Sequence, residues 1–222
     1  MNNILLLLKN IENYGLIIFI KMILYEIFFS IKFLNLKSLK YEEINNDNYI
    51  KTKNKKRYNT PYIPTPYYFL SEINKYFNRV NTKNYLFVDL GCGYSRTRFF
   101  FKHSANPFIG FDYNSNIISY LKNKNYHNSY FFNKDLRKKK NIDFLVNITK
   151  KLKKNKKIVI FFSDSFELDL LKKIIVSLKK KNTFYCVIVN LKNNNFLKIK
   201  KKVLFNKTFL NKNRNIFIFK IT

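Results

Sequence analysis

Four aspartates come directly after short, continuously apolar runs of the chain, and they are the side chains best placed to do chemistry. These aspartates are Asp89, Asp112, Asp135 and Asp164. Continuously apolar runs are typical of buried parallel strands. Doubly wound folds bind ligands at the carboxyl edge of such a sheet, so we expect the four carboxylates in one cleft, suited to a ligand with positive charge and hydroxyl groups. At any single position the alternative is an aspartate that caps the following helix.

The turn after the first of these runs reads Asp-Leu-Gly-Cys-Gly from Asp89 to Gly93. Gly91 and Gly93 permit a tight turn and close approach of a ligand to backbone N–H groups, and Ser95 is expected to cap the following helix. The turn differs from the dinucleotide fingerprint G-x-G-x-x-G because Arg96 stands at the third glycine. A strand-end carboxylate would also repel a pyrophosphate. The turn therefore favours a ligand that presents an ammonium group.

Composition limits what the charge and the cysteines can mean. The chain has 222 residues, with 43 Lys and Arg against 13 Asp and Glu, for a net charge of +30. Such a charge is typical of proteins that bind nucleic acid. Here the charge is spread along a chain rich in residues of AT-rich codons, so we assign most of it to composition. A nucleic-acid partner stays open. Two cysteines make no disulfide framework, and His103 and His127 are isolated. We expect a reduced, cytoplasmic setting and no metal site.

Strand-like and helix-like segments alternate from Tyr85 onward. The expected strands lie at 85–89, 107–112, 129–133, 157–163 and 183–190, and helical spacing is clear at 115–124 and 166–178. This βαβ series predicts an α/β fold, a doubly wound, mainly parallel sheet. Two further runs, 196–209 and 214–221, are separated only by a short turn, so they must pair antiparallel as a C-terminal hairpin.

The N-terminal segment, 1–40, is expected to be helical and hydrophobic. Its long apolar run is interrupted by Lys21, Glu26 and Lys32. Three interpretations remain open: a helix buried against the main domain or a second subunit, peripheral membrane contact through residues 16–36, and a membrane span. No secretory signal is expected. Residues 41–60 are polar and charged and are expected to link this segment to a domain at 61–222.

Two motifs carry a resemblance to a known family. F-V-D-L-G-C-G (87–93) and I-G-F-D (109–112), with the order of five strands and a hairpin, resemble the class I S-adenosylmethionine-dependent methyltransferases over about 58–222. The resemblance implies a Rossmann-like, seven-stranded sheet whose final strand inserts antiparallel. It also implies S-adenosylmethionine as cofactor and methyl transfer as activity. A bacterial subgroup has Lys and Gly where this chain has Tyr94 and Ser95, whereas Arg96 is retained.

The resemblance also implies which residues hold the cofactor. Asp89, Gly91 and Gly93 would form the loop around the methionine portion. Asp112 would accept hydrogen bonds from the ribose hydroxyls, and Asp135 would face the adenine amine. Asp89, Gly91, Gly93 and Asp112 lie in the two motifs, and Asp135 follows the third apolar run.

The fourth strand end would lie beside the transferable methyl group. Ser163 and Asp164 occupy it, and Asp164 is the candidate catalytic base. The pattern [DNS]-P-P-[YF] of base-N methylation would fall at 163–166 but lacks both prolines, and neither cysteine follows a proline. We therefore expect a protein side chain or a small molecule as methyl acceptor. An RNA methyltransferase and a non-catalytic module that binds RNA or a partner remain alternatives.

Overall fold

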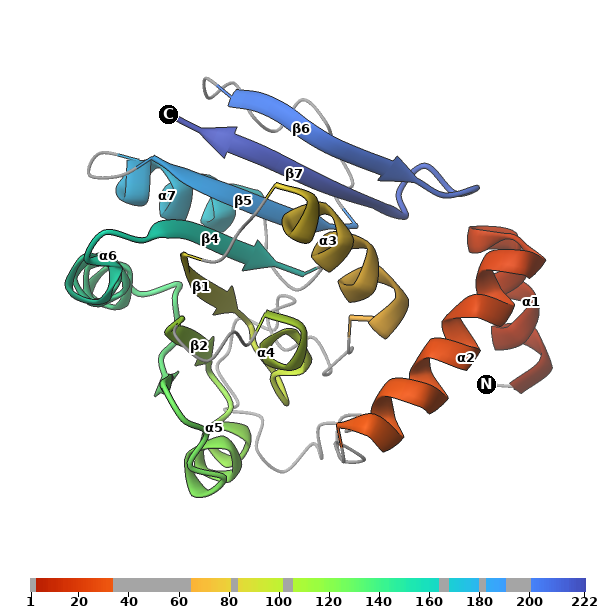
Figure 1. Ribbon diagram of the computed structural model, residues 1–222, viewed down its shortest axis with the longest axis horizontal. Helices are drawn as coiled ribbons and strands as arrows, with labels where there is room; N and C mark the ends of the chain where they lie inside the picture. The colour runs from red at the N-terminus through yellow and green to blue at the C-terminus, as the bar shows by residue number, and fades with distance from the viewer. Residues whose placement is uncertain are drawn as a thin grey trace, which may run out of the picture.

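The computed structural model describes residues 3–33, 65–80, 84–101, 106–163, 168–179, 183–190 and 201–222. Seven strands form one sheet in the order β3-β2-β1-β4-β5-β7-β6 (Figure 1). The strands are β1 (Tyr85–Leu90), β2 (Phe108–Asp112), β3 (Ser129–Asn133), β4 (Lys157–Phe162), β5 (Phe184–Val189), β6 (Lys201–Thr208) and β7 (Asn215–Ile221). β1 to β5 pair in parallel, and β7 lies antiparallel between β5 and β6. The predicted fold class is confirmed.

Helices cover both faces of the sheet, which is why β1 is buried along its whole length. On one face, α6 (Lys139–Lys153) and α7 (Leu168–Lys179) pack on alternate residues of the central strands. On the other face, α3 (Tyr67–Arg79), α4 (Arg96–Phe101) and α5 (Ser115–Asn123) cover a second core rich in aromatic rings. The predicted helix at 115–124 corresponds to α5. The predicted helix at 166–178 corresponds to α7, and its first two residues lie outside the described part of the chain.

The N-terminal segment forms two helices, α1 (Asn3–Tyr14) and α2 (Leu16–Lys32), which meet at Gly15 with a bend of 114°. In the described residues, no single helix is long and apolar enough to cross a membrane, although the bent pair from Leu7 to Lys32 would pass on length and composition. The expected linker at 41–60 lies outside the described residues, so the division into segment, linker and domain stays a prediction.

One side of α2 packs on the sheet domain. The ring of Phe29 lies 4.7 Å from that of Phe100, and Phe33 stacks on Phe99 at 4.9 Å. Ser30, between them in sequence, is buried. α2 thus borders α4, the helix that directly follows the glycine turn.

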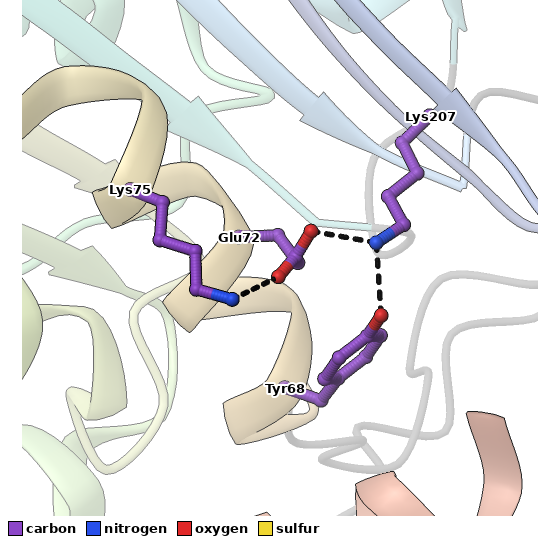
Figure 2. A network of polar contacts seen from close by, with 4 residues as sticks. All are labelled: Tyr68, Glu72, Lys75 and Lys207. Carbon is purple, nitrogen blue, oxygen red and sulfur yellow. Dashed lines mark hydrogen bonds and ion pairs between the residues drawn. The ribbon is translucent and has the colours of Figure 1, made fainter. Parts of the chain in front are cut away.

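A polar network joins the edge strand β6 to α3 (Figure 2). The ammonium of Lys207 donates to Glu72 at 2.6 Å and to the hydroxyl of Tyr68 at 2.8 Å. Lys75 binds the other carboxylate oxygen of Glu72 at 2.8 Å. Because α3 precedes β1, this network connects two parts of the chain that are distant in sequence.

Candidate functional site

The turn after β1 is held against the end of β2. Gly91 and Gly93 have φ of 78° and 47°, in the left-handed region that favours glycine. The N–H groups of Gly91 and Cys92 donate to the carbonyl oxygen of Phe111 at 2.8 and 2.9 Å. These bonds bring the turn beside Asp112, the last residue of β2.

Asp112 is tied to that turn by its own side chain. The N–H of Gly93 donates to Oδ2 of Asp112 at 3.0 Å, and the N–H of Asn114 donates to Oδ1 at 2.9 Å. Burial raises the pKa of Asp112, and these backbone bonds lower it without cancelling the effect. The cap of α5 is Asn114, whose side chain accepts from two N–H groups of the helix. Helix capping therefore does not account for Asp112.

Asp89 is the other acidic residue at the turn, and it is only 2 % exposed. The hydroxyl of Thr97, in α4, donates a hydrogen bond to its carboxyl group. Burial raises the pKa of Asp89 to about 7; the bond from Thr97 lowers it and the charge of Asp112 adds to the rise. Within the described residues, neither Asp89 nor Asp112 forms an ion pair with a basic side chain.

Three of the predicted site residues share one cleft at the carboxyl ends of β1 and β4. Asp89, Gly91 and Ser163 all line it. Its remaining lining residues are Thr65, Cys92, Arg96, Thr97 and Phe161. Since the N–H of Gly93, in the same loop, donates to Asp112, the structure brings five of the predicted residues into one neighbourhood.

Close packing beneath the turn requires a residue without a side chain at Gly110, the glycine of I-G-F-D. A Cβ atom on Gly110 would lie 2.8 Å from a ring carbon of Phe131 and 2.9 Å from the sulfur of Cys92. Burial raises the pKa of the Cys92 thiol well above its usual value. Cys92 is therefore a packing residue rather than a nucleophile.

Asp135 follows β3 and is held by a residue that the sequence analysis did not identify. The guanidinium of Arg137 donates to both carboxylate oxygens, at 2.7 and 2.9 Å. Burial alone would raise the pKa of Asp135, but the bonds from Arg137 outweigh it, so the pKa lies below its usual value. The neighbouring Lys134 N–H donates to the carbonyl of Asp112 at 2.9 Å, which places Asp135 near the end of β2. Its role toward adenine stays a prediction.

Arg96 lies at the border between the cleft and α2. Its guanidinium is 2.8 Å from Glu26 and 3.2 Å from the carbonyl of Thr65, and it lies over the ring of Tyr67 at 4.3 Å. Glu26 also accepts from the N–H of Tyr67 at 2.7 Å. One acidic residue of α2 therefore holds both the start of α3 and a lining residue of the cleft.

Two expectations about this edge turn out differently. Ser95 was expected to cap α4, but its backbone is left-handed, with φ of 58°, and its buried hydroxyl has no hydrogen-bond partner in the described part of the chain. That expectation is wrong, because the turn directs the side chain away from the helix N–H groups. Asp164, the candidate base, lies outside the described residues, while the adjacent Ser163 is half-buried. Among the residues the structure describes, no group of three acidic, His or Cys side chains could hold a metal ion.

No family model and no curated protein sequence matches this chain. Among solved structures, it resembles the proposed methyltransferase yhhF from Escherichia coli with a TM-score of 0.53 at 11 % identity, over 75 % of this chain and 92 % of that one. A proposed methylase from Haemophilus influenzae matches with a TM-score of 0.49 at 14 % identity, over 69 % and 98 %. At these identities the likeness is one of fold. The chain has the Rossmann-like fold of the class I methyltransferases.

Proposed function

We propose that the protein binds S-adenosylmethionine and transfers its methyl group to a protein side chain or a small molecule. The observation that carries the proposal is the contact between the ends of β1 and β2. The N–H of Gly93, in the turn after β1, binds the carboxylate of Asp112 at the end of β2, and Asp89 lines the cleft beside them. A mononucleotide or dinucleotide phosphate would meet two carboxyl groups here. A ligand with an ammonium group and ribose hydroxyls would meet what it requires.

The residues fit this cofactor in charge as well as in position. Asp89 is buried, and no basic side chain of the described residues pairs with it. Burying a carboxylate without a cation is costly, and the raised pKa of Asp89 expresses that cost. The amino acid ammonium of S-adenosylmethionine would supply the missing charge. The N–H groups of Gly93 and Asn114 bind different oxygens of Asp112, and each carboxylate oxygen can accept a further hydrogen bond, as two ribose hydroxyls would require.

Methyl transfer requires mainly that the acceptor and the methyl group be held in line with each other. When bound, S-adenosylmethionine supplies an electrophilic methyl group on a sulfonium. The chain would hold the cofactor through Asp89, Gly91, Gly93, Asp112 and Asp135, with Ser163 at the cleft wall, and would exclude water from the acceptor. A base is needed only for an acceptor that is protonated at neutral pH, and Asp164 is the candidate by its place after β4.

Calorimetry with S-adenosylmethionine, S-adenosylhomocysteine and NAD tests the binding step. We expect one site per chain for the first two ligands. Asp112→Ala should weaken binding by roughly 1–3 kcal/mol, because hydrogen bonds from hydroxyls to a charged acceptor are lost. Asp143→Ala, at an exposed position of α6, is the matched control and should bind normally. Heat with NAD and none with the other two ligands would contradict the proposal.

A labelled-methyl assay on fractionated lysate tests the acceptor. Protein, RNA and small-molecule pools are scored separately, with Asp112→Ala as the inactive control. We expect label in the protein or the small-molecule pool. Label in RNA would replace the proposed acceptor while keeping the methyltransferase activity. Tight cofactor binding without transfer to any pool would favour the non-catalytic module.

A further inference from the structure

One side of α2 is covered with large apolar side chains that the fold leaves in contact with solvent. Eight of them are between 42 % and 70 % exposed. They are Leu16, Ile17, Ile20, Ile23, Leu24, Ile27, Phe28 and Ile31. Monomeric soluble proteins rarely expose a contiguous apolar patch of this kind unless it binds something.

The spacing of these residues makes them one surface, which we call the outer face of α2. At 3.6 residues per turn the eight positions fall within an arc of about 140°. The opposite arc holds Glu26, Phe29 and Ser30, which pack on the sheet domain. The domain therefore uses one side of α2 and leaves the outer face without a partner in the described chain. Figure 1 shows α1 and α2 together at the periphery of the molecule, with α3 and α4 between them and the sheet.

The charges of α2 are distributed just as unevenly. Lys21 and Lys32 are exposed, and on the helix they lie together along one border of the outer face. The ammonium of Lys32 lies 5.6 Å from the ring centre of Phe28, at that border. The acidic residue of α2, Glu26, is turned inward to Arg96. The outer face is thus apolar with a basic border.

We propose that the outer face of α2 docks onto the surface of a membrane with anionic lipids. Apolar residues bordered by lysines are what an interfacial helix presents to the boundary between headgroups and acyl chains. Anionic headgroups also attract a protein with a net charge of +30. A second copy of the chain could cover the same apolar residues, but it brings another +30 and the same lysines, so repulsion opposes that pairing.

The proposed contact is parallel to the membrane rather than through it. Glu26 and the rings of Phe29 and Phe33 fix the inner side of α2 to the domain, so α2 lies flat against protein along its length. Glu26 holds Arg96, which lines the cleft, so a docked α2 would place the cleft close to the lipid surface. The docking surface itself does not depend on the proposed methyl transfer.

Flotation of the full chain with vesicles tests the proposal. The vesicles are phosphatidylcholine, with or without phosphatidylserine. We expect binding to the anionic vesicles. The double variant Ile17→Glu/Leu24→Glu should reduce the bound-to-free ratio at least about tenfold, because burial of each of these side chains contributes more than that factor when complete. The control double variant Val80→Glu/Val176→Glu changes two residues, each 45 % exposed, in α7 and just after α3. It alters the net charge equally and should bind like the unaltered chain.

Four results would overturn the proposal. The first is failure of the full chain to float with either kind of vesicle. The second is equal binding of the two double variants, which would assign binding to the overall charge. The third is a lipid-free dimer that Ile17→Glu/Leu24→Glu abolishes, which would assign the outer face to a second copy. The fourth is resistance of the vesicle-bound protein to alkaline extraction, which would indicate a span. Thermal unfolding of both double variants checks that each is folded.

Discussion

The hydroxyl of Thr97 donates a hydrogen bond to the buried carboxyl group of Asp89, so the first turn of α4 holds the acidic residue at the end of β1. The bond favours the ionised form of Asp89 in a place where burial disfavours it. Asp89 is consequently poised with a pKa of about 7, where a nearby cation can decide its charge. In the proposed function, the ammonium group of S-adenosylmethionine would be that cation.

The pH dependence of stability should report Asp89. Its pKa of about 7 lies above the usual 3.8, so the folded state holds the proton more tightly than the unfolded state does. The free energy of unfolding contributed by this group therefore falls as pH rises from about 4 to 7. Between pH 5 and 8 this fall amounts to roughly 2–3 kcal/mol, and the Asp89→Asn variant should lack it. Urea unfolding at both pH values measures it, with Asp143→Asn as the exposed control. An unchanged slope in Asp89→Asn would contradict the expectation.

Neutralising Glu26, the carboxylate that pairs with Arg96, should destabilise the fold. The Arg96 side chain is 4 % exposed and Glu26 is 26 % exposed, so Glu26→Gln removes an anion from a guanidinium that has little access to water. We expect the free energy of unfolding to fall by about 1–3 kcal/mol. This is less than the cost of breaking a fully buried ion pair, because Glu26 is partly solvated. Asp169→Asn breaks the exposed pair with Lys172 and should cost less than about 1 kcal/mol. Equal losses in the two variants, measured by denaturant unfolding, would show that burial does not matter here.

The two lysines on Glu72 offer a matched comparison (Figure 2). Lys207→Met removes a charged bond to Glu72 and a bond to Tyr68, and should cost about 1–3 kcal/mol of unfolding free energy. Lys75→Met removes an ion pair whose lysine is 54 % exposed, and should cost less than about 1 kcal/mol. Burial alone would raise the pKa of Glu72, but the two lysines lower it below the ordinary 4.5, so this contribution is present above 4.5 and is lost as pH falls through the lowered pKa. If Lys75→Met proves the more harmful, the network does not anchor β6.

Gly110→Ala should disturb the floor of the turn. The new methyl group would meet Phe131 at 2.8 Å and the sulfur of Cys92 at 2.9 Å, distances that require one of them to move. We expect the free energy of unfolding to fall by roughly 1–3 kcal/mol, as in other overpacked cores. Adding Phe131→Leu to Gly110→Ala should restore part of this stability. Thermal unfolding of the single and double variants measures the recovery, and a fully stable Gly110→Ala would show that the turn yields at no cost.

The sheet and the neighbourhood of its acidic residues could be predicted because both follow from local patterns and topology. Continuous apolar runs identified β1 to β5, and the short turn before 214–221 required an antiparallel pair. Once strands are parallel, the residues that follow them share an edge, so Asp89 and Asp112 had to lie close together. The structure adds that Gly93 is the link between turn and carboxylate.

The remaining features depend on contacts that no spacing encodes. Thr97 and Arg137 act on aspartates through side-chain geometry, and α2 reaches the cleft by the pair of Glu26 with Arg96, which lie far apart in the sequence. Ser95 has the residue type of a helix cap, but its own left-handed backbone, after Gly91 and Gly93, prevents that role. A residue type predicts a role only when the backbone delivers the side chain to it.

The position of β7 between β5 and β6 has a consequence for how the molecule opens and closes. β6 has no pairing in the described sheet except with β7, across a loop closed by the bond from the Phe209 N–H to the Arg214 carbonyl. β6 cannot join the parallel strands on its own, so any opening that releases β7 from β5 also releases β6, whereas β6 can separate from β7 alone. Hairpins of this kind form within microseconds, whereas docking on β5 brings distant parts of the chain together and is slower. Amide protons of β6 should therefore exchange with solvent at least as fast as those of β7, which is paired on both sides and buried.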